Sequence, residues 1–322
     1  MTPRFSVIIV NYNAGPHLAR AVAALSAQTC ADFEAFIVDN GSTDGSLDGL
    51  ALDDRFTLIE VGDNLGFAAG NNLAALQARG DWIVTLNPDA FANPDWLAAL
   101  DRATRRHPGV AMLGSVQVMA GDPSRFDGTG DELSVFGVAY RARHDRSVRT
   151  FTEDFPVFGP CAAAAAYRRD AFEAAGGFDE RFFCYHEDVD LALRLRGQGH
   201  RCVQVHDAVV HHVGGVTSGS GASAFAVYHG TRNRIWTWFG SMPTALKWGL
   251  LPLHLGANLA YLGWSLFRPG RFTPTARGVW DGIRGIPGML RKPMPQNGRS
   301  TVAGMLVWSP LAVIKRRNKR MR

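Results

Sequence analysis

The sequence lacks the short glycine-rich motifs by which many nucleotide-binding proteins are recognised. No G-x-G-x-x-G follows the first predicted strand, where the residues are Asn11-Tyr12-Asn13-Ala14-Gly15, and no GK[ST] ending of a P-loop occurs. A Rossmann dinucleotide-binding site and a P-loop nucleotidase are therefore excluded. A phosphate-bearing ligand would have to be bound by side chains, with a metal ion meeting its charge.

Cysteine is also scarce. The four cysteines, Cys30, Cys161, Cys184 and Cys202, form no C-x-x-C pair and show no metal-ligand spacing, so we expect free thiols in a reducing compartment. Residues 1–4 lead directly into a short apolar run, which is too brief for a secretory leader. These features predict that the main domain stays in the cytoplasm.

Acidic residues are almost absent from the C-terminal region. Residues 268–322 contain 13 Lys and Arg against the single acid Asp281, a net charge of +12, whereas 1–267 contain 21 basic and 28 acidic residues, a net charge of −7. The mildly acidic part of the chain, residues 1–267, is not typical of a nucleic-acid-binding domain. A basic tail after an apolar segment favours an anionic membrane surface as its partner.

Apolar strand-like runs alternate with amphipathic helical segments through the first 118 residues. The predicted strands are 5–10, 33–38, 56–61, 82–86 and 110–118, and the predicted helices begin at Pro16 and cover 71–79 and 94–107. This alternation predicts an α/β fold with an open, mostly parallel sheet and helices on both faces.

The middle of the chain, 120–157, has no clear period and is expected to form irregular or antiparallel elements beside the sheet. Regular structure returns with 157–169 and a helix ended by Gly176-Gly177. A further helix is expected over 187–196, with apolar residues at helical spacing.

Polar side chains follow four of the predicted strands: Asn11-Tyr12-Asn13, Asp39-Asn40, Gly62-Asp63-Asn64 and Asn87-Pro88-Asp89. In open α/β sheets, ligands bind beyond the carboxyl ends of the strands. Four such strand ends together indicate a ligand with many hydrogen-bonding groups. Asp89, on a tight turn, offers a hard oxygen ligand for Mg²⁺ or Mn²⁺.

An ordered set of motifs resembles family 2 glycosyltransferases, most closely their rhamnosyltransferase-like branch, over about residues 4–240. These motifs are Val7-Ile-Ile-Val-Asn-Tyr-Asn13, Val38-Asp-Asn-Gly-Ser-Thr-Asp44, Asn64-Leu-Gly-Phe-Ala-Ala-Gly-Asn-Asn72, Leu86-Asn-Pro-Asp89, Gly176-Gly-Phe-Asp-Glu-Arg-Phe-Phe183 and Glu187-Asp-Val-Asp-Leu191. The resemblance implies a GT-A fold, a nucleotide-sugar donor and inversion at the anomeric carbon.

The resemblance also implies roles for individual residues. Tyr12 and Asp39 are similar to the pair that binds the base, and Asp89 is similar to the last acid of the metal-binding D-x-D. Asn87 stands where the first acid would be, which leaves Asp89 as the main charged ligand. The full set expected to bind the donor is Asn11, Tyr12, Asp39, Asn64, Gly66, Asn71, Asn87 and Arg232.

The remaining implied roles lie in the second half of the chain. His212, which precedes Gly214-Gly215, matches a family histidine that reaches the metal or the diphosphate. Asp188 matches the base that takes the acceptor proton. Glu187 is expected to steer the acceptor or to raise the pKa of Asp188 by like-charge repulsion, and Asp190 to have a structural role.

We expect a catalytic domain over 1–240, with a donor half of about 1–118 and an acceptor half of about 119–240, and a membrane-association region over 241–322. The segment 248–267 carries no charged residue. Helices lying in the interface at the inner face of the cell membrane are favoured for it, with a true span or soluble packing as alternatives.

The sequence thus predicts an inverting, metal-assisted glycosyltransferase. It would move a sugar, with rhamnose preferred, from a dTDP- or UDP-linked donor to a lipid-linked acceptor of a cell-envelope glycan. The alternatives are a non-catalytic nucleotide-sugar-binding scaffold and a hydrolase of the donor. The sequence carries no signal of oligomeric state.

Overall fold

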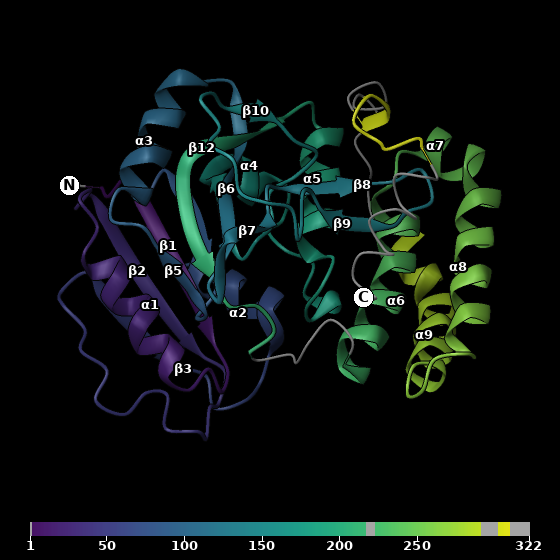
Figure 1. Cartoon of the computed structure of the whole chain (residues 1–322), viewed down its shortest axis with the longest axis horizontal. Coiled ribbons are helices and arrows are strands. Elements are labelled where there is room, and N and C mark those ends of the chain that lie inside the picture. The colour runs from purple at the N-terminus through teal and green to yellow at the C-terminus, as the bar shows by residue number, and fades with distance from the viewer. Residues whose placement is uncertain (1, 217–222, 291–301, 310–322) are drawn as a thin grey trace.

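The computed structural model describes residues 2–216, 223–290 and 302–309. A large sheet with its covering helices forms one side of the molecule, and a group of C-terminal helices forms the other (Figure 1). The basic end of the chain beyond residue 309, with the end of the apolar segment 302–314, lies outside the described residues.

The main sheet is mixed and mostly parallel. Its strands are β1 (Phe5–Asn11), β2 (Phe33–Asp39), β3 (Phe56–Glu60), β4 (Trp82–Leu86), β5 (Ala90–Ala92), β6 (Val110–Met119), β7 (Asp122–Gly128), β10 (Phe155–Pro156), β11 (Ala164–Arg168) and β12 (Arg201–His212). The order is β10-β12-β6-β11-β4-β1-β2-β3, with β5 on β12 and β7 on β6. Strand β11 runs antiparallel between β4 and β6, while β4, β1, β2 and β3 are parallel.

Both faces of the sheet are covered by helices, and alternate residues of β1 pack into the two hydrophobic cores that result. Val7 and Ile9 pack with α1 (Pro16–Ser26) and α3 (Trp96–Arg106). Ile8 and Val10 face the core that contains α2 (Gly66–Ala75), α4 (Arg169–Ala174) and α5 (Glu187–Gly197). The α/β fold expected from the sequence is confirmed.

Helix α2 begins five residues before the predicted helix at 71. The reason is local: the Asn64 side chain accepts a hydrogen bond from the Gly66 amide at 3.0 Å, and Gly66 has a positive φ of 83°. The Asn64 oxygen orders the loop before the helix, and glycine tolerates the positive φ at its first residue. The loop and the helix start are therefore one unit.

The segment without a clear period forms short antiparallel pieces, as expected. Strand β7 pairs with β6, and β8 (Asp131–Leu133) forms a two-stranded sheet with β9 (Ala139–Arg141). The β8–β9 pair lies between the main sheet and the C-terminal helices (Figure 1).

Four helices follow the sheet: α6 (Ala224–Ser241), α7 (Thr244–Gly249), α8 (Leu251–Ser265) and α9 (Phe272–Leu290). Helix α9 packs closely on α6 through Gly278 and Gly282; a Cβ at Gly278 would lie 2.8 Å from the Tyr228 carbonyl oxygen. The uncharged segment 248–267 is divided between α7 and α8. None of the described helices is both long enough and apolar enough to cross a bilayer.

Candidate active site

The ends of β1 and β2 are joined by buried hydrogen bonds. The Asn11 amide donates to Asp39 Oδ1 at 2.7 Å, and the Ser42 backbone N–H donates to Asp39 Oδ2 at 2.9 Å. Tyr12 follows at the end of β1 with its side chain partly exposed. The residues expected to bind the base therefore lie at adjacent strand ends, with the Asp39 carboxylate held in place by its neighbours.

Three buried amide oxygens at this edge of the sheet have no hydrogen-bond partner in the described part of the chain: Asn11 Oδ1, Asn40 Oδ1 and Asn71 Oδ1. Buried polar atoms without a partner are rare in native proteins. Their gathering at the carboxyl edge supports a ligand site there.

The donor-side loop contacts the segment that precedes the acidic pair. The Ala68 backbone N–H donates to the Phe183 carbonyl at 3.1 Å, and a Cβ at Gly66 would lie 2.6 Å from that same oxygen. Asn72, on the next turn of α2, holds both the N–H and the carbonyl of Phe178 at 2.9 and 2.8 Å. Gly66 is thus needed for the close approach of the two halves of the site.

Asp89 and His212 are brought together by β5 and β12, because Ala90 pairs with His212 in the antiparallel register. His212 Nε2 lies 3.2 Å from Asp89 Oδ1 and 3.3 Å from the Asn87 amide. The Gly214 backbone N–H donates to Asp89 Oδ2 at 3.0 Å. The geometry selects His212, rather than its neighbour His211, as the partner of Asp89.

Asp127, on β7, orients the His212 ring. Its Oδ2 lies 2.7 Å from His212 Nδ1, and it also pairs with Arg141 of β9. Burial by itself would lower the pKa of His212, but hydrogen bonds with Asp127 and Asp89 raise it. Burial would raise the pKa of Asp89, whereas His212 and the Gly214 amide hold it below the usual range.

These residues fit a divalent cation. With Nδ1 hydrogen-bonded to Asp127, Nε2 of His212 faces Asp89, and loss of the Nε2 proton would free a lone pair for a metal ion, as in a metal-binding histidine held by a carboxylate. In an octahedral site with bonds of about 2.1 Å, neighbouring ligand atoms lie about 3 Å apart, close to the observed 3.2 Å. Asp89 and His212 are therefore the residues that would hold the ion.

Glu187 and Asp188 begin α5 and have different environments. Glu187 is buried and its Oε2 has no partner among the described residues, whereas Asp188 is partly exposed. Asp188 accepts hydrogen bonds from the backbone N–H groups of Val189 and Ala162 at 2.8 and 3.2 Å. An exposed, oriented carboxylate suits a general base.

The pKa of Asp188 is raised, but burial rather than repulsion by Glu187 is the leading cause. Burial, followed by the charge of Asp188, raises the pKa of Glu187 well above its usual range and so favours its neutral form. Burial raises the pKa of Asp188 as well, but the two backbone N–H donors oppose that rise. Asp188 is therefore the carboxylate of the pair, because its donors stabilise the charged form.

Helix α6 supports the segment before the acidic pair. The Asn233 amide donates to the carbonyls of Phe182, Cys184 and Tyr185 at 2.9, 2.8 and 2.7 Å. Phe183, Tyr185 and His186 all have positive φ, a conformation that non-glycine residues adopt only when held. The clamp therefore fixes a strained turn directly before Glu187.

Arg232 belongs to the same support. Its guanidinium donates to the Phe182 carbonyl at 2.9 Å and lies 4.2 Å from the centre of the Trp236 ring. Its contact with a diphosphate stays a prediction. Asp190 is fully buried and pairs with Arg194 at 2.8 Å and with Ser241, in keeping with the structural role expected for it.

Sequence reasoning missed Asp127, Asp131 and Arg141, all from the segment without a period. Asp127 supports His212, and Asp131 lies beside Asp188. A signal was present: two aspartates flank Gly128-Thr129-Gly130, an unusual acidic and glycine-rich run between apolar residues. Their partners, however, lie 85 and 57 positions away along the chain, at His212 and Asp188.

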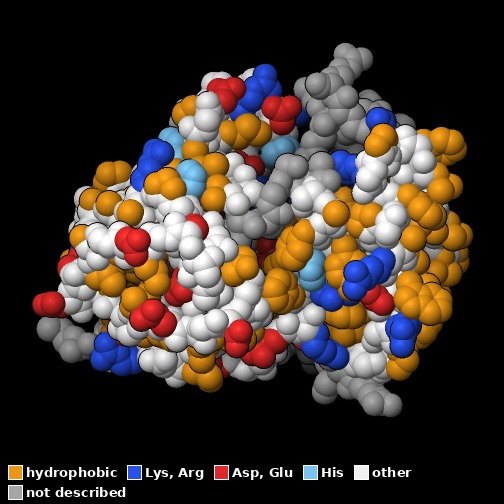
Figure 2. All heavy atoms as spheres, turned by 90° about the horizontal axis from the view of Figure 1, so that it is seen from below, with side chains coloured by type: hydrophobic (Ala, Val, Ile, Leu, Met, Phe, Trp, Pro, Cys, Tyr) orange, Lys and Arg blue, Asp and Glu red, His pale blue; other side chains and the backbone are white. Residues whose placement is uncertain are grey.

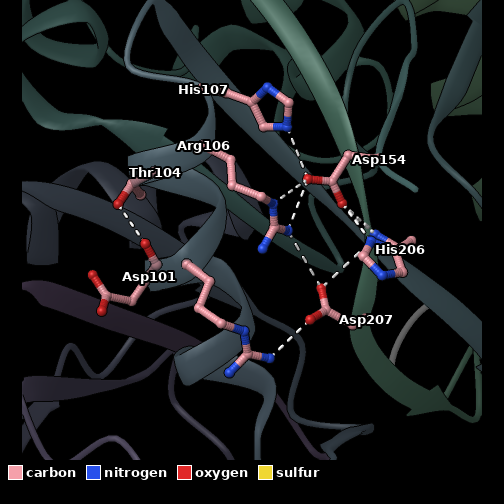
Figure 3. Close-up of polar contacts among 8 residues, drawn as sticks. Asp101, Thr104, Arg106, His107, Asp154, His206 and Asp207 are labelled. Atoms are coloured by element: carbon pink, nitrogen blue, oxygen red, sulfur yellow. Dashed lines mark hydrogen bonds and ion pairs between the residues drawn. The ribbon is translucent and has the colours of Figure 1, made fainter. Parts of the chain in front are cut away.

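A second polar cluster joins α3, β12 and the approach to β10 (Figure 3). Asp154 accepts from the His206 ring at 2.7 Å and pairs with Arg106 and His107, each at 2.8 Å. Asp207 lies close enough to share a cation with Asp154 and His206, but Arg102 and Arg106 already neutralise these acids. The cluster is a structural anchor for the segment before β10.

Replacing Asp154 with Asn should lower the free energy of unfolding by about 3 kcal/mol at neutral pH, because a nearly buried charge partner is removed. Although burial by itself would raise the pKa of Asp154, His206, Arg106 and His107 lower it, so its contribution is present above pH ~4 and is lost as the pH falls toward the lowered value. Urea titrations at several pH values would measure this. The control is Asp145→Asn in the exposed Arg125 pair, expected to cost under about 1 kcal/mol; equal losses would contradict the anchor role.

The fold is that of GT-A glycosyltransferases. It is similar to Staphylococcus aureus TarS in complex with UDP-GlcNAc (TM-score 0.58, 18% identity, 89% of this chain and 82% of that chain). It is also similar to the mannosyltransferase PcManGT from Pyrobaculum calidifontis with GDP-Man and Mn²⁺ (TM-score 0.54, 18% identity, 89% and 88% covered).

The chain belongs to glycosyl transferase family 2, whose model matches residues 6–176. It is 33% identical over 261 residues to the N-acetylglucosaminyl-diphospho-decaprenol L-rhamnosyltransferase of Mycobacterium tuberculosis, covering 71% of this chain and 82% of that protein. It is also 32% identical to the O-antigen biosynthesis protein RfbC of Myxococcus xanthus, over 66% of this chain and 17% of that protein. The protein is thus an inverting glycosyltransferase.

Proposed function

We propose that this glycosyltransferase moves a rhamnosyl residue from a dTDP- or UDP-linked donor to a hydroxyl of a lipid-diphosphate-linked glycan. The similarity to a rhamnosyltransferase that acts on a decaprenyl-diphosphate sugar carries this proposal. Asp188 takes the proton of the acceptor hydroxyl as its oxygen attacks the anomeric carbon. The bond to the diphosphate breaks on the opposite face, and no covalent sugar–enzyme intermediate forms.

The donor is proposed to lie along Asn11, Tyr12 and Asp39, with its diphosphate near Asn87. Asp89 and His212 would hold Mn²⁺ or Mg²⁺, which when bound supplies positive charge at the leaving diphosphate. The imidazole nitrogen favours Mn²⁺, since Mg²⁺ prefers an all-oxygen set. Solved structures of the same fold contain Mn²⁺.

The C-terminal helices are proposed to rest on an anionic membrane surface. Large apolar side chains of α8, α9 and their connection are exposed, with Phe267 83%, Leu259 68% and Trp280 61% accessible. Figure 2 shows apolar side chains gathered on the side where Figure 1 places α8, with Lys and Arg beside them. Arg268 and Arg271 lie over the Trp264 ring, so basic charge accompanies the apolar surface, as at a headgroup boundary.

Replacing both Leu259 and Phe267 with Ser should weaken binding to phosphatidylglycerol vesicles at least about tenfold, because each side chain loses apolar area buried in the interface. Vesicle co-sedimentation measures this, and added salt should weaken the binding of the unchanged protein. The matched control is Leu76→Ser, which lies after α2 and is 85% exposed. Equal loss in both variants, or none in the double variant, would contradict this orientation.

The proposed activity is tested with a panel of dTDP- and UDP-sugars, Mn²⁺ or Mg²⁺, and a synthetic prenyl-diphosphate-N-acetylglucosamine acceptor. The expected result is nucleoside diphosphate release that requires both the rhamnosyl donor and the acceptor, with a lipid product one deoxyhexose heavier. Release that proceeds equally well without the acceptor would indicate donor hydrolysis instead.

A further inference from the structure

Asp131 lies beside Asp188 in the folded protein, although the two residues are far apart in the sequence. It begins β8, is 6% exposed, and its backbone N–H donates to the Gly159 carbonyl at 2.8 Å. A carboxylate oxygen of Asp131, one of Asp188 and the Cys161 sulfur all lie within 4.8 Å of one another. The carboxyl groups of Asp131 and Asp188 are therefore close neighbours.

Two carboxyl groups can form a hydrogen bond only if one of them carries a proton. The pair has unequal surroundings. Both oxygens of Asp188 accept backbone N–H groups, at 2.8 and 3.2 Å, and these favour its ionised form. Burial and the charge of Asp188 raise the pKa of Asp131 well above its usual range. The proton of the pair therefore resides on Asp131.

Other groups that face this pair favour a single negative charge. Arg141 pairs with Asp127 and lies near both Asp131 and Asp188, so its positive charge stabilises one carboxylate between them. Burial favours the neutral form of the neighbouring Glu187. The titratable or charged side chains that act on the pair are Asp127, Arg141, Cys161, Tyr167, Glu187 and Cys202.

We propose that Asp131 is a positioning residue that holds a proton and donates it in a hydrogen bond to Asp188. This bond keeps Asp188 ionised and fixes its orientation toward the acceptor. The inference rests on the proposed role of Asp188 as the base. During transfer the acceptor O–H bond breaks and its proton passes to Asp188, while the electron pair of the anomeric C–O bond leaves with the diphosphate. Both carboxyls are then protonated, and one proton returns to solvent before the next turnover.

The inference is tested first without substrate, so its failure is separable from failure of the proposed function. Infrared spectra of the full-length protein at neutral pH should show protonated-carboxyl C=O bands from both Asp131 and Glu187. Asp131→Asn should remove one band, and Glu187→Gln should remove the other. An unchanged spectrum in Asp131→Asn would overturn the proposal.

Turnover supplies the second test. Asp131→Ala should lower kcat about 10- to 100-fold with little change in the KM of the donor, since Asp131 touches only the base. Asp131→Asn should recover much of that loss, because its amide donates as the protonated acid does. The wild-type rate should fall at alkaline pH as Asp131 ionises, and Asp131→Asn should lack this fall. Full kcat in the alanine variant, or no rescue by asparagine in a variant with unaltered thermal unfolding, would contradict the assignment.

Discussion

Asp188→Asn should lower kcat by about 10²- to 10⁴-fold while leaving nucleoside diphosphate binding nearly unchanged. An amide of the same size cannot take the acceptor proton, and this range is what a positioned general base contributes. Asp188 is partly exposed at the start of α5, and the Val189 and Ala162 amides orient its oxygens. Asp89 and His212, on β5 and β12, belong to a different part of the site, so donor binding should not follow the loss of turnover.

Product formation under saturating donor and acceptor measures the fall in kcat. Calorimetry with the nucleoside diphosphate and Mn²⁺ measures whether nucleotide binding is unchanged. Glu187→Gln is the matched control. Since burial favours the neutral form of Glu187, a neutral amide resembles that form, and we expect a far smaller loss of turnover. Near-wild-type turnover in Asp188→Asn, or equal losses in both variants, would refute the assignment of the base.

Asp89→Ala should abolish metal-dependent donor binding and lower kcat/KM at least about 100-fold, the equivalent of about 3 kcal/mol of charge stabilisation. Asp89 is the carboxylate that faces Nε2 of His212, and Asn87 cannot replace it because an amide carries no charge. Titration of Mn²⁺ in the presence of dTDP or UDP measures the change. Asp127→Asn is a useful comparison. It leaves Asp89 and His212 in place but removes the carboxylate that is hydrogen-bonded to His212 Nδ1, and we expect the affinity for Mn²⁺ to fall about 10- to 100-fold.

The same pair predicts the pH dependence of metal binding. The pKa of His212 is raised by its contacts with Asp127 and Asp89, so its ring carries a proton over a wider pH range than a free histidine. A metal must displace that proton, and its affinity should therefore rise with pH until the ring is neutral. Metal affinity that is independent of pH, or an Asp89→Ala variant with an unchanged titration, would remove Asp89 and His212 from the metal site.

Much of the site could be predicted because its residues lie at strand ends and at a helix start that the neighbouring sequence marks. The strand ends at Asn11, Asp39 and Asn87, and the helix start at Glu187, are local features with clear patterns on either side. The start of α2 was predicted too late, because the Asn64 side chain orders the preceding loop and the positive φ of Gly66 replaces hydrophobic periodicity there. The pKa of Asp188 is raised, with burial rather than repulsion by Glu187 as the leading cause.

The sequence by itself determined the α/β alternation, the family and the identity of the two acidic motifs, because strand periodicity and strand-end chemistry are properties of neighbouring residues. Only the tertiary structure decided which groups meet. It placed His212 against Asp89 through the β5–β12 pairing, set Asp127 behind that histidine, and brought Asp131 to Asp188 from a segment without a period. Such contacts depend on burial and on pairing between distant strands, and a side chain changes its pKa through the burial, charges and hydrogen bonds that folding brings to it.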